Sequence, residues 1–423
     1  QQIGANVMYQ SEGMNAQVGA SIMPRNIFNE TNGKQYTDNA MNWAPNASIR
    51  ADLGENANLR INYTGRSNQP STNQLMPVMD NTNPTRMSLG NPYLTSYFNH
   101  NFRTEIGYTN RTTFFTTRLS ANGSVNQSPI VNATWMDNAS VQYSFPINAA
   151  PSWNGSLSWM INTPIGKSNF RINNNLSMNY SESHSYLGVA SIDMTGYFNE
   201  SKEFDYELFH SDYFGENPTK NFNDYFKDNK NQNLSFNENL RITYRLDYFE
   251  ATVGGRTRVS MPKSTYESLN SSPTTWNNSV SLNVTWNEPN TGLGLTADGT
   301  YNWYIGYTTN QPANFIVNTE ITKLIFNNNA TLAIRGYDLL NQTKTFNESI
   351  NGNRRTESRS LALGRYVIVS LTFRFGTFGR GNRGGGRGGN RGGGNFQGGG
   401  MRGGGMPMGG GMGGGMPMGM PPM

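Results

Sequence analysis

The chain has 423 residues, no cysteine, 12% aromatic residues and a formal net charge of +5. An aromatic content of this size excludes an ordinary disordered chain. The lack of cysteine excludes disulfide frameworks, thiolate metal sites and cysteine nucleophiles. No apolar run reaches the roughly 18 residues that a membrane-spanning helix needs, which excludes a helical membrane protein.

The positive charge is concentrated at the C-terminal end. Residues 376–423 contain five arginines and no acidic residue: Arg380, Arg383, Arg387, Arg391 and Arg402. Of the 33 basic residues, the other 28 are balanced by 28 acidic residues. The rest of the chain is therefore neutral, and it shows no charge pattern typical of nucleic-acid binding.

Apolar and polar residues alternate with period two from the first residues onward, which predicts an all-β protein. Leu59, Ile61 and Tyr63, for example, alternate with polar residues. We predict about fifteen strands, near residues 1–9, 13–23, 43–53, 56–66, 97–109, 112–124, 152–163, 168–180, 231–246, 248–260, 274–286, 291–306, 313–325, 328–337 and 361–375. Segment 139–146 could form a further piece of strand inside a loop.

The lengths of strands and connections favour a membrane barrel. Many runs exceed ten residues, whereas strands in globular sheets average about 5–6 and tilted membrane strands about 9–11. Tight turns alternate with long polar loops, which we expect near 24–42, 67–96, 125–151, 181–230, 261–273 and 338–360. Outer-membrane barrels have this rhythm, with short turns on the periplasmic side and long loops outside.

The segment 361–375 is predicted to be the last strand. Val367, Val369, Leu371 and Phe373 lie on one side of it, and we expect them to face lipid. We expect Ser370, Thr372 and Arg374, on the other side, to face the lumen. A soluble barrel would show the same alternation with the faces reversed, so this strand alone does not decide between them. The predicted organisation is a transmembrane antiparallel β-barrel at 1–375 and a low-complexity tail at 376–423.

The tail is rich in Gly, Arg and Met and allows several interpretations. A flexible appendage that buries no core is the simplest. Its Arg-Gly-Gly repeats at 383–393 are similar to RNA-binding segments. Its methionines at 401–423 offer soft ligands to Cu(I), and contact with cell-wall polymer or a periplasmic partner is a further possibility. We predict that the tail is mobile in the periplasm and that deleting it leaves assembly intact.

The predicted loop 181–230 holds the best candidate ligands. Its histidines and acidic residues are His184, His210, Asp193, Glu203, Asp205, Glu207, Asp212 and Asp224. Oxygen and imidazole ligands could form a surface site for a cation or a nutrient. Its aromatic residues are Tyr197, Phe198, Phe204, Tyr206, Phe209, Tyr213 and Phe214. These aromatic residues could stack on sugars or peptides, or the loop could fold on itself. Because no ligand spacing repeats, we assign no metal, cofactor or ligand-binding residues.

Two groups of motifs resemble a known family. Residues 69–94 read Gln69-Pro70-Ser71, Gln74-Leu75-x-Pro77, Asp80-Asn81-x-Asn83-Pro84 and Gly90-Asn91-Pro92-x-Leu94. Near the end stand Tyr337-Asp338-Leu339-Leu340-Asn341-Gln342 and Gly364-Arg365-Tyr366. Both groups resemble the barrel of TonB-dependent receptors, especially the receptor-like outer membrane β-barrel family. Thr95-Ser96-Tyr97 departs from the Lys-Pro-Glu that the family usually has there.

The resemblance implies a barrel of about twenty-two strands in the outer membrane, an internal plug and an inner-membrane partner that supplies energy. None of the plug motifs occurs here. Single-chain bacterial barrels have an even number of strands, so we expect further strands and a plug before Gln1.

The function predicted from sequence is nutrient uptake or surface ligand binding by an outer-membrane receptor or transporter. We expect no enzyme, because no nucleophile elbow, P-loop or zinc-protease motif occurs. Partners are outer-membrane lipid and an unidentified nutrient, with no nucleic acid. Two rivals remain: a structural or adhesive barrel without transport, and a soluble β-rich RNA-binding protein.

Overall fold

The computed structural model describes residues 2–373 except 32–33, 78, 199–203, 216, 267–272, 309–310, 328, 344, 352–353 and 361–362. The chain divides into two units, Gln1–Arg374 and Phe375–Met423, and the description concerns the first. The predictions made for the tail at 376–423 lie outside the described residues.

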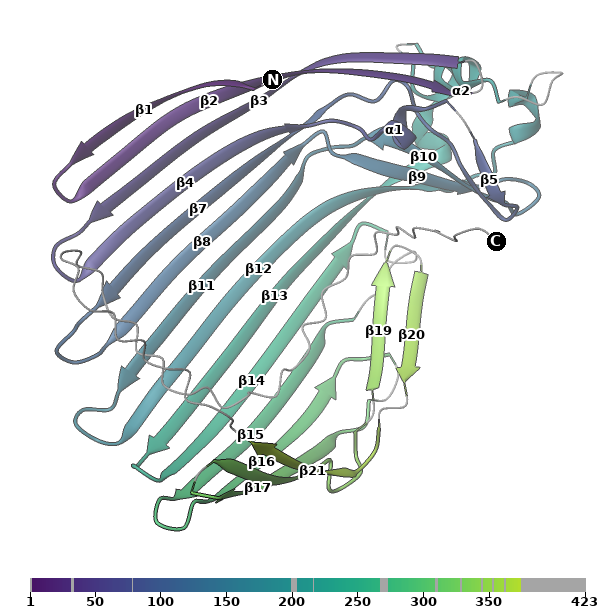
Figure 1. The fold of residues 1–423 in the computed structure, drawn as a ribbon. Coiled ribbons are helices and arrows are strands. Elements are labelled where there is room, and N and C mark those ends of the chain that lie inside the picture. The colour runs from purple at the N-terminus through teal and green to yellow at the C-terminus, as the bar shows by residue number, and fades with distance from the viewer. Residues whose placement is uncertain are drawn as a thin grey trace, which may run out of the picture. The chain divides into compact units, whose positions relative to one another are not determined.

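Fifteen long strands of the described residues follow one another as an antiparallel meander (Figure 1). They are β1 (Ile3–Ser11), β2 (Met14–Thr31), β3 (Lys34–Asp52), β4 (Ala57–Asn68), β7 (Tyr97–Thr109), β8 (Thr116–Gln127), β11 (Ser152–Pro164), β12 (Phe170–Gly188), β13 (Phe226–Arg245), β14 (Phe249–Ser264), β15 (Thr275–Glu288), β16 (Leu293–Ile305), β17 (Asn314–Ile325), β18 (Ala330–Tyr337) and β21 (Tyr366–Phe373). Each corresponds to one predicted strand, so the predicted all-β class and strand order are confirmed.

Residue alternation gives this sheet two faces of opposite character. In β15, Val280 and Leu282 project to one side, and Ser281 and Asn283 project to the other. The register carries this division across the sheet, since Ser281 pairs with Gly254 and Thr300. We call the side of Val280 the outer face and the side of Ser281 the inner face.

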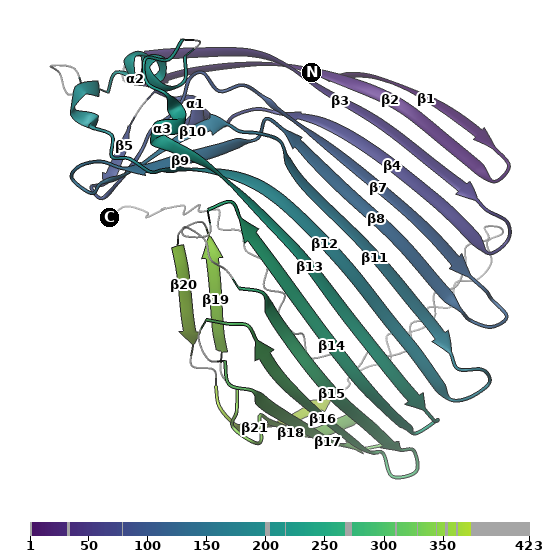
Figure 2. The same ribbon diagram turned by 180° about the vertical axis from the view of Figure 1, so that it is seen from behind.

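The connections are sorted by sheet end, as the sequence predicts. Short turns join the strands at one end, and two of them use glycines with positive φ, Gly13 (75°) and Gly54 (86°). The longest connections, at 69–96, 128–151 and 189–225, gather at the other end (Figures 1 and 2). Because successive strands are antiparallel, every second connection falls at the same end.

Several predicted boundaries are wrong. Strand β12 continues to Gly188 and β13 begins at Phe226, so the predicted loop 181–230 is shorter at both ends, and His184 lies in β12. The expected loop 24–42 is almost entirely strand, because β2 and β3 stay paired from Ile22–Trp43 through to Thr31–Lys34. Backbone hydrogen bonds in a hairpin do not require apolar side chains, so a polar composition does not end the ladder. Strand β8 begins four residues later than predicted, because the Asn110 side chain accepts hydrogen bonds from the amides of Thr112 and Thr113 in a turn.

The described residues within 69–96, 128–151 and 189–226 fold together at the long-loop end, and we call them the cap. Its elements are α1 (Thr72–Leu75), β5 (Asp80–Asn83), β6 (Arg86–Ser88), β9 (Ile130–Met136), β10 (Gln142–Asn148), the 3₁₀ helix η1 (Met194–Tyr197), α2 (Tyr206–Tyr213) and α3 (Phe222–Tyr225). Strand β10 pairs with β9 and, in parallel, with β6. The further piece of strand within 139–146 is therefore present, as β10.

A separate two-stranded sheet, β19 (Thr345–Asn351) and β20 (Arg354–Ser360), occupies the predicted loop 338–360. Among the described residues, β1 pairs only with β2, and β21 pairs only with β18. No helix in the described part of the chain is both long and apolar enough to cross a membrane.

Candidate functional site

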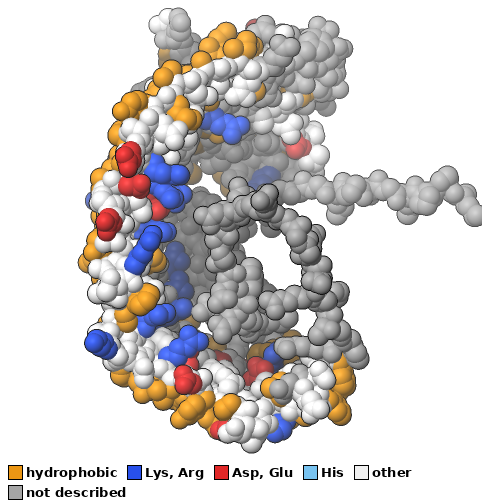
Figure 3. All heavy atoms as spheres, turned by 60° about the vertical axis from the view of Figure 1, so that its left-hand side comes forward, with side chains coloured by type: hydrophobic (Ala, Val, Ile, Leu, Met, Phe, Trp, Pro, Cys, Tyr) orange, Lys and Arg blue, Asp and Glu red, His pale blue; other side chains and the backbone are white. Residues whose placement is uncertain are grey.

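The outer face of the sheet is apolar and unusually exposed. Large aliphatic side chains point outward from almost every long strand: Val7, Val18, Ile49, Ile61, Ile106, Leu119, Leu157, Leu176, Leu240, Val253, Val280, Leu282, Leu295, Ile321, Ile334 and Val369. Figure 3 shows hydrophobic side chains along this outer edge. A continuous exposed apolar surface of this extent marks a contact with lipid or protein.

Aromatic rings border this apolar face at both ends. Near the short turns, Phe170 contacts Tyr244 with ring centroids 4.7 Å apart. Near the long loops, Trp43 stacks on Phe98 at 4.6 Å. An outward apolar band between two aromatic girdles is typical of strands that cross an outer membrane.

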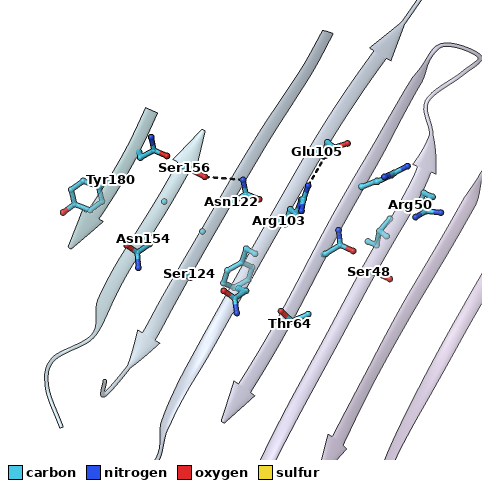
Figure 4. Close-up of a pocket in the computed structure, with 18 of the residues that line it drawn as sticks. Ser48, Arg50, Thr64, Arg103, Glu105, Asn122, Ser124, Asn154, Ser156 and Tyr180 are labelled. Atoms are coloured by element: carbon cyan, nitrogen blue, oxygen red, sulfur yellow. Dashed lines mark hydrogen bonds and ion pairs between the residues drawn. The ribbon is translucent and has the colours of Figure 1, made fainter. Parts of the chain in front are cut away.

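The inner face carries the candidate functional site. A cavity of 1010 Å³ runs along it between β1 and β13 (Figure 4). Its polar lining comprises Asn15, Gln17, Ser48, Arg50, Arg60, Asn62, Thr64, Asn101, Arg103, Glu105, Asn122, Ser124, Asn154, Ser156, Asn179, Ser181, Asn233 and Ser235. These amides, hydroxyls and guanidinium groups can bind a water-soluble molecule. They project from the inner face of the sheet, opposite the apolar outer face.

Arginines give this polar face a positive character. Glu105 is nearly buried. Its carboxylate oxygens form ion pairs with the guanidinium nitrogens of Arg103 at 3.5 Å and Arg118 at 3.4 Å. Arg60 lies directly opposite Glu105 on the neighbouring strand, and Arg50 lies opposite Arg60. Figure 3 shows Lys and Arg side chains gathered in the hollow of the sheet. Alternation within the predicted strands 43–53 and 56–66 already places Arg50 and Arg60 on a polar face, but it does not single them out as a site.

The acidic residues of loop 181–230 are dispersed. Asp193 and Asp205 accept hydrogen bonds at 3.0 Å from the amides of Thr195 and Leu208, at the starts of η1 and α2. Asp212 pairs with Lys220 at 3.1 Å. Glu207 and Asp224 are exposed in the first turns of α2 and α3, and Glu203 lies outside the described residues. These carboxylates mainly cap helices or pair with a lysine.

The two candidate histidines contact different residues and do not form one site. His184 Nδ1 lies 2.9 Å from Asp228 on the neighbouring strand. His210 stacks on Tyr93 at 3.8 Å between centroids, and its burial lowers the pKa of the imidazole. Within the described residues, no three His, Cys, Asp or Glu side chains form a metal-binding group.

The aromatic residues of the same loop form the core of the cap. Phe209 is fully buried and stacks on Trp135 at 5.6 Å. Tyr197, Phe204, Tyr206 and Tyr213 are buried around it, and burial raises the pKa of the Tyr206 hydroxyl. These rings pack on one another, so they are not available to stack on a sugar or peptide.

The motifs of the family resemblance have structural roles in the described loops. A Cβ added to Gly90 would lie 1.8 Å from the carbonyl oxygen of Met76. Asn91 Nδ2 donates to the carbonyl of Pro146 at 2.8 Å, which ties segment 69–94 to β10. Asp338 accepts from the amides of Gln342 at 2.9 Å and Thr343 at 2.8 Å, which closes the turn after β18.

Comparison with known proteins places this architecture in a family. No curated protein sequence matches the chain. Similar solved structures include a mutant of the ferric enterobactin receptor from Pseudomonas aeruginosa (12% identity, 88% of this chain and 69% of that chain covered, TM-score 0.24). Others are the ferric-catecholate import receptor Fiu from E. coli K12 (10%, 88% and 80%, 0.34) and the outer membrane transporter YddB from Escherichia coli (8%, 88% and 75%, 0.24). Residues 9–249 match the family described as "Outer membrane protein beta-barrel family", so the chain belongs to this family, as the sequence motifs predict.

Proposed function

We propose that this chain forms the wall of an outer-membrane receptor or transporter that takes up or binds a water-soluble nutrient. The outer face contacts lipid, and the inner face is the surface along which the solute binds or passes. The cap lies on the extracellular side and the short turns on the periplasmic side.

The observation that carries the proposal is the opposition of the two faces. The same strands expose aliphatic side chains outward and line a polar cavity of 1010 Å³ inward. A soluble β-barrel needs the reverse arrangement, with its apolar side chains inside. This contrast also disfavours the soluble RNA-binding alternative.

The edges of the sheet bear on how the wall is completed. In lipid, an unpaired strand edge is not tolerated, because its backbone groups have no water to bind. The outer edges of β1 and β21 have no strand partner among the described residues. We therefore expect both edges to be paired in the membrane, either with each other or with further strands of a barrel of about twenty-two strands. An internal plug and an energy-supplying inner-membrane partner belong to this proposal through the family resemblance.

The folded cap favours a second candidate, surface ligand binding or adhesion without transport. The described residues of the cap have their own aromatic core, a cluster of fourteen buried apolar residues. A rigid structure at the loop end can bind a ligand whether or not solute passes below it.

Permeation measurements separate the two candidates. The full chain is produced in outer membranes, purified and placed in lipid vesicles, and the entry of neutral oligosaccharides is measured. If solute passes along the inner face, the double variant Asn122→Trp/Ser156→Trp slows entry, because both side chains line the cavity. The outward variant Leu157→Trp is the control and leaves entry unchanged. Absence of entry in the unmodified protein would support binding without transport, and recovery in the soluble fraction would overturn the membrane assignment.

A further inference from the structure

The inner face contains a cluster of four arginines around one carboxylate. Register pairing places Arg50 opposite Arg60 and Arg60 opposite Glu105. Arg103 and Arg118 lie on the same face and contact Glu105. The cluster therefore brings four positive charges and one negative charge together on four adjacent strands, β3, β4, β7 and β8.

The charges of this cluster are not balanced by its own residues. Glu105 is occupied by Arg103 and Arg118. Among the described residues, neither Arg50 nor Arg60 has an ion pair or side-chain hydrogen bond, and both are exposed to the cavity. Like charges directly opposite each other destabilise a sheet, so a bound anion would relieve their repulsion.

Two arginines elsewhere in the sheet, Arg335 and Arg245, each have a carboxylate partner. Arg335 binds Glu320 through two nitrogens, at 2.9 and 3.0 Å. Arg245 pairs with Glu250 at 3.1 Å. Each of these guanidinium groups has a cross-strand carboxylate of its own. The contrast shows that the fold can supply a partner, and that it supplies none to Arg50 and Arg60 within the described residues.

The surroundings of the two arginines suit an oxyanion. Asn15 lies opposite Arg50, and Asn62 lies on the inner face two residues from Arg60. Both line the same cavity, and their amide groups can donate further hydrogen bonds. Figure 4 shows Arg50 on β3 and Arg103 on β7, with the strand that carries Thr64, β4, between them. A guanidinium group matches a carboxylate or phosphate with two parallel hydrogen bonds.

We propose that Arg50 and Arg60, with Arg103 beside them, form a binding site for an oxyanion group of a solute, either a carboxylate or a phosphate. This inference rests on the proposed function and specifies its substrate class: the solute that uses the inner face is anionic. The ion pairs of Arg103 and Arg118 with Glu105 hold the neighbouring side chains in place and limit the charge of the site.

Equilibrium binding tests the site directly. Citrate and inorganic pyrophosphate are titrated separately into the full chain in neutral detergent at low ionic strength, with heat as the readout. We expect both probes to bind, and each arginine removed to weaken binding by about tenfold, the effect of losing one charged hydrogen bond. Arg50→Gln/Arg60→Gln therefore loses about a hundredfold. Glu105→Gln strengthens binding, because it frees Arg103 and Arg118 and removes the negative charge.

The control is Arg241→Gln/Arg258→Gln, which removes the same charge from the inner face outside the cluster. Arg241 lies opposite Asn173 and Gly254, and Arg258 lies opposite Asn237 and Asn277, so neither has another arginine directly opposite it in the register. Equal loss in the control, or no binding by the unmodified chain, overturns the proposal. Tighter binding of hexaglutamate than of citrate would assign the site to an acidic polypeptide and would also overturn it.

Permeation distinguishes this inference from the proposed function beneath it. Suppose that neutral oligosaccharides enter the vesicles, but that citrate enters equally fast with the unmodified chain and with Arg50→Gln/Arg60→Gln. The proposed anion site is then wrong, and the proposed transport function stands. If neither solute enters, the transport function fails, while citrate binding still reports on the site.

Discussion

The cap and the wall of long strands expose their apolar side chains in opposite ways. In the cap, Phe209 is 0% exposed and lies between Trp135 and Phe145, with centroids at 5.6 and 5.3 Å. In the wall, Val280 and Leu282 are 49% and 50% exposed on the outer face. The cap is folded around its own core, whereas the wall lacks a core of protein and needs lipid to cover its apolar side.

This difference predicts two separate stabilities. Apolar burial stabilises the cap through contacts within the chain, whereas the same effect reaches the wall only when lipid surrounds it. A substitution in the cap core should therefore leave the wall intact, and a substitution on the outer face should have its full effect only in a bilayer.

The largest expected effect is in the cap. Phe209→Ala should destabilise the cap by about 3–5 kcal/mol, because it leaves a cavity among buried rings. Hydrogen exchange of α2 and β9 should accelerate while that of β14 and β15 stays slow. Leu208→Ala on the same helix is the control, since Leu208 is exposed. Equal acceleration in the wall would show that the two regions unfold together.

On the outer face, Val369→Arg should cost about 2–4 kcal/mol if the site lies near the bilayer midplane. Val369 pairs with Ile334 on the outward side of β18 and β21. Ser370→Arg, on the inner face, should cost much less because its charge is solvated. Denaturant unfolding in lipid vesicles measures both, and a greater cost for Ser370→Arg would reverse the assignment of the faces.

Glu238 is a charged residue on the apolar outer face, so it tests whether that face contacts lipid. It lies between Phe236 and Leu240 on that side of β13, and Asn174 Nδ2 donates a hydrogen bond to its carboxylate. A carboxylate toward lipid is unfavourable, so Glu238→Leu should stabilise the wall by about 1 kcal/mol in vesicles. The inward variant Asn239→Leu is the control and should give no gain. Loss of stability in Glu238→Leu would show that the hydrogen bond from Asn174 outweighs the cost of the outward charge.

The smallest effect concerns Glu182, which lies opposite Trp153 near the long-loop end of β12. Its ion pair with Lys230, at 2.7 Å, lowers the pKa of the carboxyl to about 2. A lowered pKa in the folded state stabilises above the unfolded value of about 4.3, and this contribution disappears as the pH falls towards 2. Exchange protection of β12 should decline across that window and should be independent of pH there in Glu182→Gln. An unchanged decline in the variant would assign the pH dependence to other groups.

The wall was predictable from the sequence because its signal is local. Period-two alternation in segments such as 274–286 and 291–306 identifies each strand, and meander topology follows from the short turns. Strand ends were less predictable, because β2 and β3 continue as a polar hairpin that carries no alternation signal. The face of Arg50, Arg60 and Glu105 was predictable, but their cross-strand adjacency depends on the register of β4 with β7, two strands separated by residues 69–96.

The cap was not predictable in the same way. Its aromatic residues are visible in the sequence, but its core joins side chains from three connections that are distant in the chain, such as Leu89, Trp135 and Phe209. Long-range contacts of this kind leave no periodic pattern. For the same reason, the sequence could not decide whether the acidic residues of loop 181–230 would converge; in the structure, Asp193 and Asp205 cap two different helices.

The central claim, that lipid covers the outer face and water fills the inner face, is tested most directly by cysteine scanning along β15. The chain contains no cysteine, so each substitution provides a unique label. Single cysteines are placed at 279–284 in the full chain in vesicles, and labels there are quenched with brominated lipid or with a water-soluble quencher. We predict lipid quenching at Val280, Leu282 and Val284 and aqueous quenching at Ser279, Ser281 and Asn283. The reverse pattern, or aqueous quenching at all six positions, would contradict the account.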